Sequence, residues 1–159
     1  MKSILIYANQ ITNQDLSKIF KKIDPNKEKY LLNILERRGK LTREKLSKRL
    51  NPEWFDVVIF PLQSTNLEQG LLSLDTKQLL DLEGVKFAHD LEQHNYKGKI
   101  ILTTPFVFYA QIERLIRDFC DPERNSNDLK ETPFINLYSL LSSERESKLL
   151  NSLEGIPLY

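Results

Sequence analysis

Residues 55–61 read Phe-Asp-Val-Val-Ile-Phe-Pro, and this stretch decides the fold class. Its β-branched and aromatic core shows no alternation between apolar and polar positions, which is typical of a strand buried on both faces. Residues 100–104 (Ile-Ile-Leu-Thr-Thr) and 3–7 (Ser-Ile-Leu-Ile-Tyr) have the same character. Strands of this kind occupy the centre of parallel sheets, so the sequence predicts a parallel sheet that is covered by helices.

Amphipathic helices are predicted between these strands. Apolar residues recur at the spacing i, i+3, i+4 and i+7 in two segments, which places them on one face of a helix. We expect one helix that is capped by Thr12 or Asn13 and ends at residues 24–26, and another over residues 108–120. The two apolar stripes are Leu16, Ile19, Phe20 and Ile23, and Ile112, Leu115, Ile116 and Phe119.

Three further helices are predicted from their start signals. Thr42 is expected to cap a short basic helix that turns Leu46 inward. A second helix follows Gly84, and a capping box at residues 143–146 (Ser-Glu-Arg-Glu) opens a third.

Residues 30–35 (Tyr-Leu-Leu-Asn-Ile-Leu) are ambiguous. Their composition favours a helix, whereas the logic of a parallel sheet favours a strand, and we expect a strand. With a last strand at residues 134–138, the predicted fold is α/β, a flavodoxin-like or receiver-like doubly wound parallel sheet of five strands in the order 2-1-3-4-5. Residues 1–159 form one predicted domain with helices on both faces and an extended insert at residues 62–83.

Composition excludes several classes of protein. The 159 residues are 40% hydrophobic and 28% charged, which is typical of a globular domain and excludes general disorder. Lys and Arg total 23 against 22 Asp and Glu, so net charge gives no case for wholesale binding to nucleic acid or membranes. The lone Cys120 cannot form an internal disulfide, and no apolar run is long enough for a signal peptide or a spanning helix. We therefore expect a cytoplasmic protein.

The middle of the chain resembles the receiver domain of response regulators. Residues 56–60 (Asp-Val-Val-Ile-Phe) match the approach to the phosphate-accepting aspartate, and Pro61 stands where that aspartate would be. Residues 84–91 (Gly-Val-Lys-Phe-Ala-His-Asp-Leu) resemble the helix after the acceptor, and residues 100–104 resemble the fourth strand with its terminal Thr. This combination is similar to inactive receiver-like domains encoded beside ATPases in prokaryotic conflict (defence) systems.

The departures from the receiver pattern are chemical. Receivers place acidic residues after strand one to hold Mg²⁺, whereas this chain has residues 8–10 (Ala-Asn-Gln) there. Residues 137–140 (Leu-Tyr-Ser-Leu) lack the receiver lysine that follows strand five. Phosphoryl transfer to a carboxylate needs the carboxylate, and Mg²⁺ prefers anionic oxygen ligands. The resemblance therefore implies a domain that cannot be phosphorylated, with no catalytic residues, no cofactor and no metal.

Neutral residues gather at the predicted carboxyl ends of the strands, where such sheets bind ligands. They are Asn9, Gln10, Pro61, Ser64, Thr103 and Thr104. One interpretation is a small polar pocket, the degenerate phosphorylation site, in a sensor or degrading enzyme for a nucleotide second messenger. The other is that these side chains cap helices and satisfy loop backbone groups. No glycine-rich loop is present to cradle phosphates.

Residues 36–50 carry seven basic against two acidic side chains. Clustered cations of this kind contact nucleic-acid phosphates or an acidic protein partner, and they also occur as a plain solvated helix face. The basic side chains are Arg37, Arg38, Lys40, Arg43, Lys45, Lys48 and Arg49. His89 and His94 are five residues apart rather than four, so no metal site is expected there.

An interaction surface is predicted beside the strand ends, where receivers dock their partners. Exposed leucines in the insert and aromatic residues after the fourth strand would form it, although the leucines would also suit a short helix packed on the sheet. The residues are Leu71, Leu72, Phe106, Phe108 and Tyr109. The predicted function is a non-catalytic signalling or interaction module that acts through protein partners, such as an ATPase or effector encoded nearby, or as a homodimer. The alternatives are the nucleotide sensor or degrading enzyme and nucleic-acid binding through residues 37–49.

Overall fold

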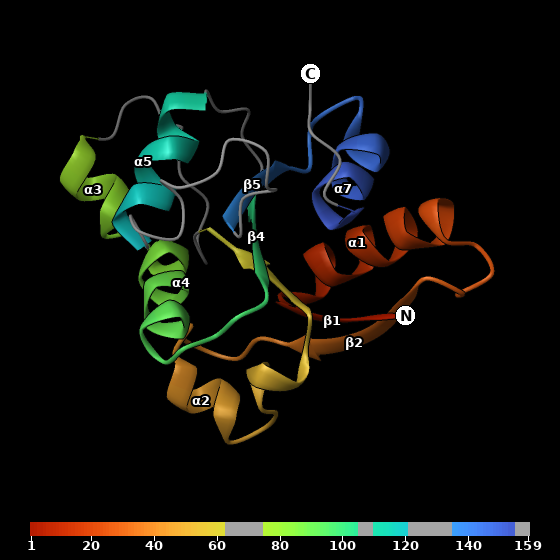
Figure 1. Ribbon diagram of the computed structural model, residues 1–159, viewed down its shortest axis with the longest axis horizontal. Helices are drawn as coiled ribbons and strands as arrows, with labels where there is room; N and C mark the ends of the chain where they lie inside the picture. Colours follow the sequence, from red (N-terminus) through yellow and green to blue (C-terminus); the bar gives the residue numbers. More distant parts are fainter. Residues whose placement is uncertain (63–74, 105–109, 121–134, 155–159) are drawn as a thin grey trace.

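The computed structural model describes residues 1–62, 75–104, 110–120 and 135–154. It contains one five-stranded sheet whose strands are all parallel and lie in the order β2-β1-β3-β4-β5 (Figure 1). This confirms the predicted α/β class and the doubly wound order. The strands are β1 (Lys2–Ala8), β2 (Tyr30–Glu36), β3 (Val57–Pro61), β4 (Lys99–Thr104) and β5 (Ile135–Ser139).

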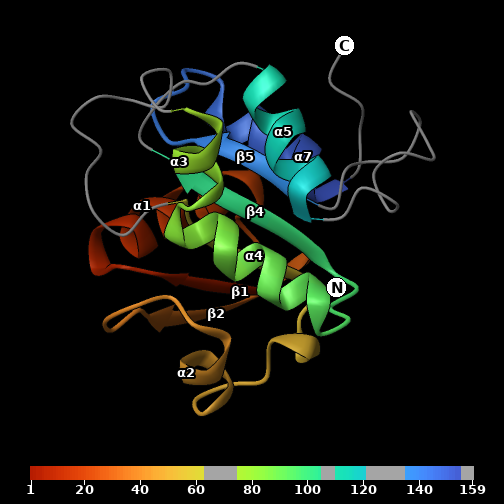
Figure 2. The ribbon, with the colours of Figure 1, turned by 90° about the vertical axis from the view of Figure 1, so that its left-hand side faces the viewer.

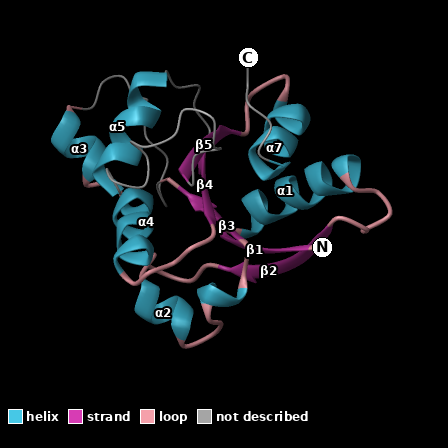
Figure 3. Cartoon of the chain, viewed as in Figure 1, coloured by secondary structure: helices cyan, strands magenta, loops and turns pink. Residues whose placement is uncertain are grey.

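Helices cover both faces of this sheet. Helices α4 (Glu83–Gln93) and α5 (Ala110–Cys120) lie on one face, together with the short α3 (Thr76–Leu80) (Figure 2). Helices α1 (Gln10–Ile23) and α7 (Arg145–Glu154) lie on the other (Figure 3). The short α2 (Arg43–Ser47) packs against α4, and a 3₁₀ turn, η1 (Pro52–Trp54), leads into β3. Within the described ranges, no helix combines the length and the apolar character that crossing a bilayer requires.

Two apolar clusters result from the alternation of side chains along the strands. On β1, Ile4 and Ile6 pack toward α1 and α7, whereas Leu5 and Tyr7 pack toward α4 and α5. Every residue of β3 is buried, as the unbroken apolar pattern of this segment predicts. The ambiguous segment at residues 30–35 is the edge strand β2, so parallel-sheet logic predicted it correctly and local composition did not.

The N-terminus of α1 differs from the prediction. Asn9 is its N-cap and accepts a hydrogen bond from the Thr12 N–H at 2.8 Å, so the prediction that Thr12 or Asn13 caps this helix is wrong. The chain turns into the helix directly after β1 ends at Ala8, which leaves the residue at position 9 to satisfy the first free N–H groups. Asn13 is instead buried, and its side-chain N–H donates to the Ala8 carbonyl at 3.0 Å.

Asp24 organises the turn between α1 and β2. Its carboxylate accepts hydrogen bonds from the N–H groups of Glu28, Lys29 and Tyr30 at 3.0–3.1 Å. Burial acts to raise the pKa of Asp24, but these three bonds and the nearby Lys29 charge outweigh it, so the pKa lies below its ordinary value. The carboxylate thus binds the N–H of Tyr30, the first residue of β2.

Gly84 lets α4 approach the end of β3 very closely. Its N–H donates to the Leu62 carbonyl at 2.8 Å. A Cβ atom at this position would lie 2.3 Å from the Pro61 carbonyl oxygen and 2.7 Å from the Leu62 Cα, both of which are backbone atoms. The first turn of α4 is therefore packed directly on the carboxyl end of the central strand, and only glycine fits there.

We expect Gly84→Ala to lower the free energy of unfolding by about 1–3 kcal/mol, because the added methyl group forces backbone segments apart. Urea denaturation measures the change. Lys86→Ala on the exposed side of the same helix is the control and should stay within about 0.5 kcal/mol of the parent. An unchanged urea midpoint for Gly84→Ala would contradict the close packing of α4 on β3.

Candidate functional site

The carboxyl edge of the sheet brings together most of the residues that the sequence places in a strand-end pocket. Pro61 and Thr103 are direct neighbours in the pairing of β3 with β4. Pro61, Thr103 and Thr104 are all buried, whereas Asn9 and Gln10 are exposed where β1 leads into α1. Ser64 lies outside the described residues. The described part of this edge thus has exposed amide side chains at one end and buried hydroxyl groups at the other.

Backbone contacts fill the space beyond β3 at this edge. The Leu62 N–H donates to the Thr103 carbonyl at 2.8 Å, which extends the ladder between β3 and β4 by one residue. The Leu62 carbonyl in turn accepts from Gly84. Leu62 itself is buried, and Asn9 uses its side-chain oxygen to cap α1. Asn9 and Thr103, two of the predicted pocket residues, therefore take part in local backbone hydrogen bonding.

A groove lies beside this edge, between α1 and the outer strand β2. Its volume is about 450 Å³, and it is open to solvent. Polar and cationic side chains of α1 form one wall, and β2 contributes an apolar and an acidic residue. The lining residues are Gln10, Asn13, Gln14, Ser17, Lys18, Lys21, Ile34 and Glu36. Sequence patterns missed this groove because no motif pairs the polar face of one helix with an edge strand.

The basic segment after β2 does not form one uniform patch. Arg37 has a side chain only 10% exposed, and its guanidinium lies 3.8 Å from the Glu83 carboxylate. Glu83 also accepts a hydrogen bond from the Leu41 N–H at 2.5 Å, so this carboxylate ties the segment to α4. Arg37 therefore has a structural role. The exposed cations of the segment are Arg38, Lys40, Lys45, Lys48 and Arg49, and Arg43 is half-buried.

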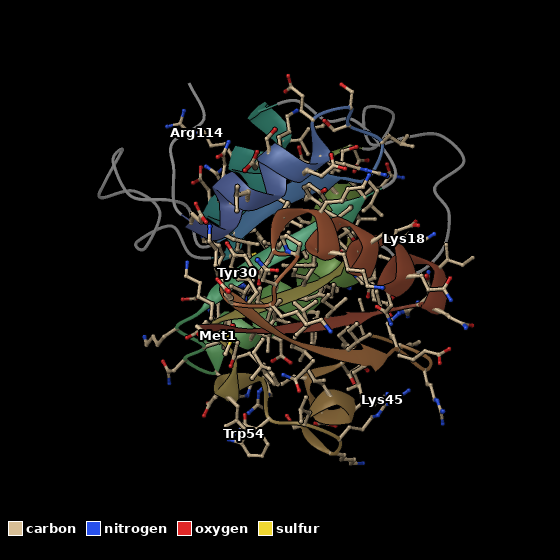
Figure 4. All side chains as sticks on the ribbon, turned by 90° about the vertical axis from the view of Figure 1, so that its right-hand side faces the viewer. Met1, Lys18, Tyr30, Lys45, Trp54 and Arg114 are labelled. Atoms are coloured by element: carbon tan, nitrogen blue, oxygen red, sulfur yellow. The ribbon has the colours of Figure 1, made fainter. Side chains whose placement is uncertain are left out.

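Arg49 joins the basic segment to the last residue of β2. Its guanidinium donates to the Glu36 carbonyl at 2.6 Å, at the end of β2 where the groove also ends. Lys18 and Lys21 of α1 line the same groove and are exposed. Figure 4 shows Lys18 of α1 and Lys45 of α2 at the same side of the molecule. We define the basic surface as Lys18, Lys21 and Arg49.

The two histidines have separate surroundings. The His94 ring nitrogen lies 3.1 Å from the Asp90 carboxylate, whereas the His89 ring packs on Phe119 with centroids 4.9 Å apart. Across the described ranges, no three His, Cys, Asp or Glu side chains are grouped in a way that would hold a metal ion. The predicted interaction residues Leu71, Leu72, Phe106, Phe108 and Tyr109 lie outside the described residues.

A lysine pair lies at the opposite, amino edge of the sheet, and no sequence pattern predicts it. Lys2 and Lys99 both donate to carbonyls in the last turn of α7, those of Leu153 and Ser152. Burial, with a contribution from the nearby Lys2 charge, lowers the pKa of Lys99 from 10.5 to about 8. Cations at a helix C-terminus satisfy free carbonyls and the helix dipole, so this pair anchors α7 to the sheet.

Comparison of the chain with protein-family models, with curated proteins and with solved structures gives no match in any of the three.

The lowered pKa of Lys99 predicts a rise in stability with pH. Between pH 8 and pH 10 the folded chain binds fewer protons at Lys99 than the unfolded chain, whose lysine titrates near 10.5, so the free energy of unfolding increases. Urea denaturation across this range should show the rise, and Lys99→Met should abolish it. Lys148→Met, at an exposed position of α7, is the control. A rise that persists in Lys99→Met would show that another group causes it.

Proposed function

We propose that this chain is a non-catalytic, non-phosphorylatable receiver-like signalling module that acts through protein partners. The packing of α4 on the end of β3 carries this proposal. In the receiver pattern, the acceptor carboxylate stands at the position that Pro61 occupies in this chain. Here Pro61 is buried, and the Gly84 N–H binds the carbonyl of the next residue at 2.8 Å. The backbone of another element thus lies against the place where phosphate chemistry would need open space.

Two further observations support a module over an enzyme or a nucleotide sensor. Thr103 and Thr104 are buried, so their hydroxyl groups do not line an open pocket in the described part of the chain. Asn9 uses its side-chain oxygen for the helix cap. Function then depends on surfaces, and the resemblance to defence-system domains implies an ATPase or effector encoded nearby as the partner.

We expect the double variant Leu71→Asp/Leu72→Asp to lose this partner. Receivers dock partners on the surface next to the third strand, and a carboxylate in an apolar contact is costly to desolvate. Tagged full-length chain, expressed in its own host and captured by its tag, should enrich one protein that mass spectrometry identifies. Enrichment should fall by about tenfold or more in the double variant.

Gln93→Glu is the matched control, because it adds a negative charge at an exposed position at the end of α4. Its capture profile should equal that of the parent chain. Equal capture by the leucine variant would contradict the proposed surface. Incorporation of phosphate from acetyl phosphate and Mg²⁺ into the parent chain would contradict the non-phosphorylatable assignment.

A second candidate function is binding of single-stranded nucleic acid at the basic surface. The observation in its favour is the Arg49–Glu36 hydrogen bond. It holds the exposed Arg49 against Glu36, which lines the groove together with Lys18 and Lys21. Phosphates are bound by cations that converge from separate elements, and a groove follows the backbone of a single strand.

This candidate predicts salt-dependent binding of a labelled single-stranded oligonucleotide. Lys18→Ala/Lys21→Ala should weaken binding and reduce the slope of log K against log salt by about one for each phosphate that the variant no longer neutralises. Fluorescence anisotropy over a salt series measures both effects. Lys148→Ala removes an exposed lysine on α7 and should leave the slope unchanged. Equal slopes for all three proteins would contradict binding at the basic surface.

A further inference from the structure

The outer edge of β2 is the feature that carries a further inference. Within the described chain β2 pairs only with β1, since it is the first strand in the sheet order (Figure 1). The Lys29 carbonyl and the Arg37 N–H both bond toward β1. Because backbone groups alternate in direction along a strand, the odd-numbered residues face β1 and the even-numbered residues face outward.

Both ends of this outer edge already have partners. The Tyr30 N–H donates to Asp24 at 3.0 Å, and the Glu36 carbonyl accepts from Arg49 at 2.6 Å. Between them, the outward N–H and C=O groups of Leu32 and Ile34 have no hydrogen-bond partner among the described residues. Proteins usually protect such open edges, because they are templates for pairing with another strand. Here the ends are protected and the centre is not.

The side chains of the open centre are apolar and exposed on both faces of the sheet. Leu31 is 52% exposed and Ile34 is 49% exposed. Leu32 packs with the α1 side of the sheet and Leu35 with the α4 side, so Ile34 belongs to the first side and Leu31 to the second. Asn33 lies between them. The five residues 31–35 (Leu-Leu-Asn-Ile-Leu) are therefore palindromic in chemical character about Asn33.

We propose that β2 pairs antiparallel with β2 of a second copy of this chain, about a twofold axis that passes between the two Asn33 residues. A twofold interface is self-complementary, so a strand that pairs with itself needs a sequence with the same character in both directions. The proposal identifies a surface and a partner for the module proposed above, but it concerns a different part of the chain from the leucines of the insert.

The register follows from the directions of the free backbone groups. With Asn33 opposite Asn33, Leu32 of each copy faces Ile34 of the other, and the two residues exchange both N–H···O=C bonds. At each end the free Glu36 N–H faces the free Tyr30 carbonyl of the second copy. The other two groups of this end pair are the Tyr30 N–H and the Glu36 carbonyl, which already bond to Asp24 and Arg49. The pattern of occupied and open groups thus matches one register.

Side chains and charges fit the same register. Leu31 comes opposite Leu35 on one face, and Ile34 comes opposite Leu32 on the other, so the exposed apolar residues are covered. Glu36 is the only charged residue of β2, and it faces Tyr30 rather than another acid. The groove beside Ile34 leaves room for the side chains of the incoming strand on the α1 face.

Charge substitution at Asn33 tests the proposal, because this residue faces itself across the axis and belongs to neither apolar cluster. Sedimentation equilibrium of the purified full chain should show a species of twice 18.7 kDa. Asn33→Asp and Asn33→Lys should each raise the dissociation constant by about tenfold or more, since like charges meet. An equimolar mixture of the two variants should dimerise again, because opposite charges then face each other.

Cysteine cross-linking checks the register independently. In the proposed register the two residues 33 form a non-hydrogen-bonded pair, whose Cα atoms lie within the distance that a disulfide spans. Oxidised Asn33→Cys should therefore form a covalent dimer. Leu31→Cys should not, because residue 31 faces residue 35; Cys120 is buried in both variants. A monomer at all concentrations, or dimerisation that neither charge variant weakens, would overturn the proposal. Such a failure would leave partner capture through Leu71 and Leu72 unaffected, so the two proposals fail separately.

Discussion

Burial of β3 on both faces is the constraint on which the rest of the structure depends. All five residues of Val57–Pro61 are buried, so helices must cover the sheet on both sides and the strand can occupy only the centre. A central parallel strand requires crossover connections, and these place the helix N-termini at the carboxyl edge of the sheet. The close contact between Gly84 and the end of β3 belongs to this arrangement.

The two ends and the one open side of the sheet have different roles. At the amino edge, Lys2 and Lys99 tie the end of α7 to the sheet. At the carboxyl edge, the first turn of α4 packs on the end of β3, where the Gly84 N–H donates to the Leu62 carbonyl. The β2 side instead carries unpaired backbone groups, exposed apolar residues and a groove with two lysines. In the described chain, exposed apolar side chains of β2 and exposed lysines of α1 thus lie on the same side of the sheet.

Single residues show why some elements were predictable and others were not. The strand at residues 100–104 and the helix stripe from Leu16 to Ile23 depend on local apolar periodicity, and both occur as predicted. Asn9 was predicted only as one of several strand-end residues that could cap helices, and the cap of α1 was assigned to Thr12 or Asn13. The position of the cap depends on where β1 ends, and Thr12 is an equally good capping residue. The structural role of Arg37 depends on Glu83, which is distant in sequence, so no local pattern distinguishes it from its exposed neighbours.

The sequence by itself determined the fold class, because the local spacing of apolar residues distinguishes buried strands from amphipathic helices. It also determined that position 61 carries no carboxylate, so Pro61 itself cannot accept a phosphoryl group. Only the tertiary structure decided that Gly84 packs on the end of β3 and that Arg49 reaches the end of β2. It also decided that the outward backbone groups of Leu32 and Ile34 find no partner in the part of the chain that the structure describes. These features arise from how segments far apart along the chain meet or fail to meet, and periodicity within a segment carries no information about that.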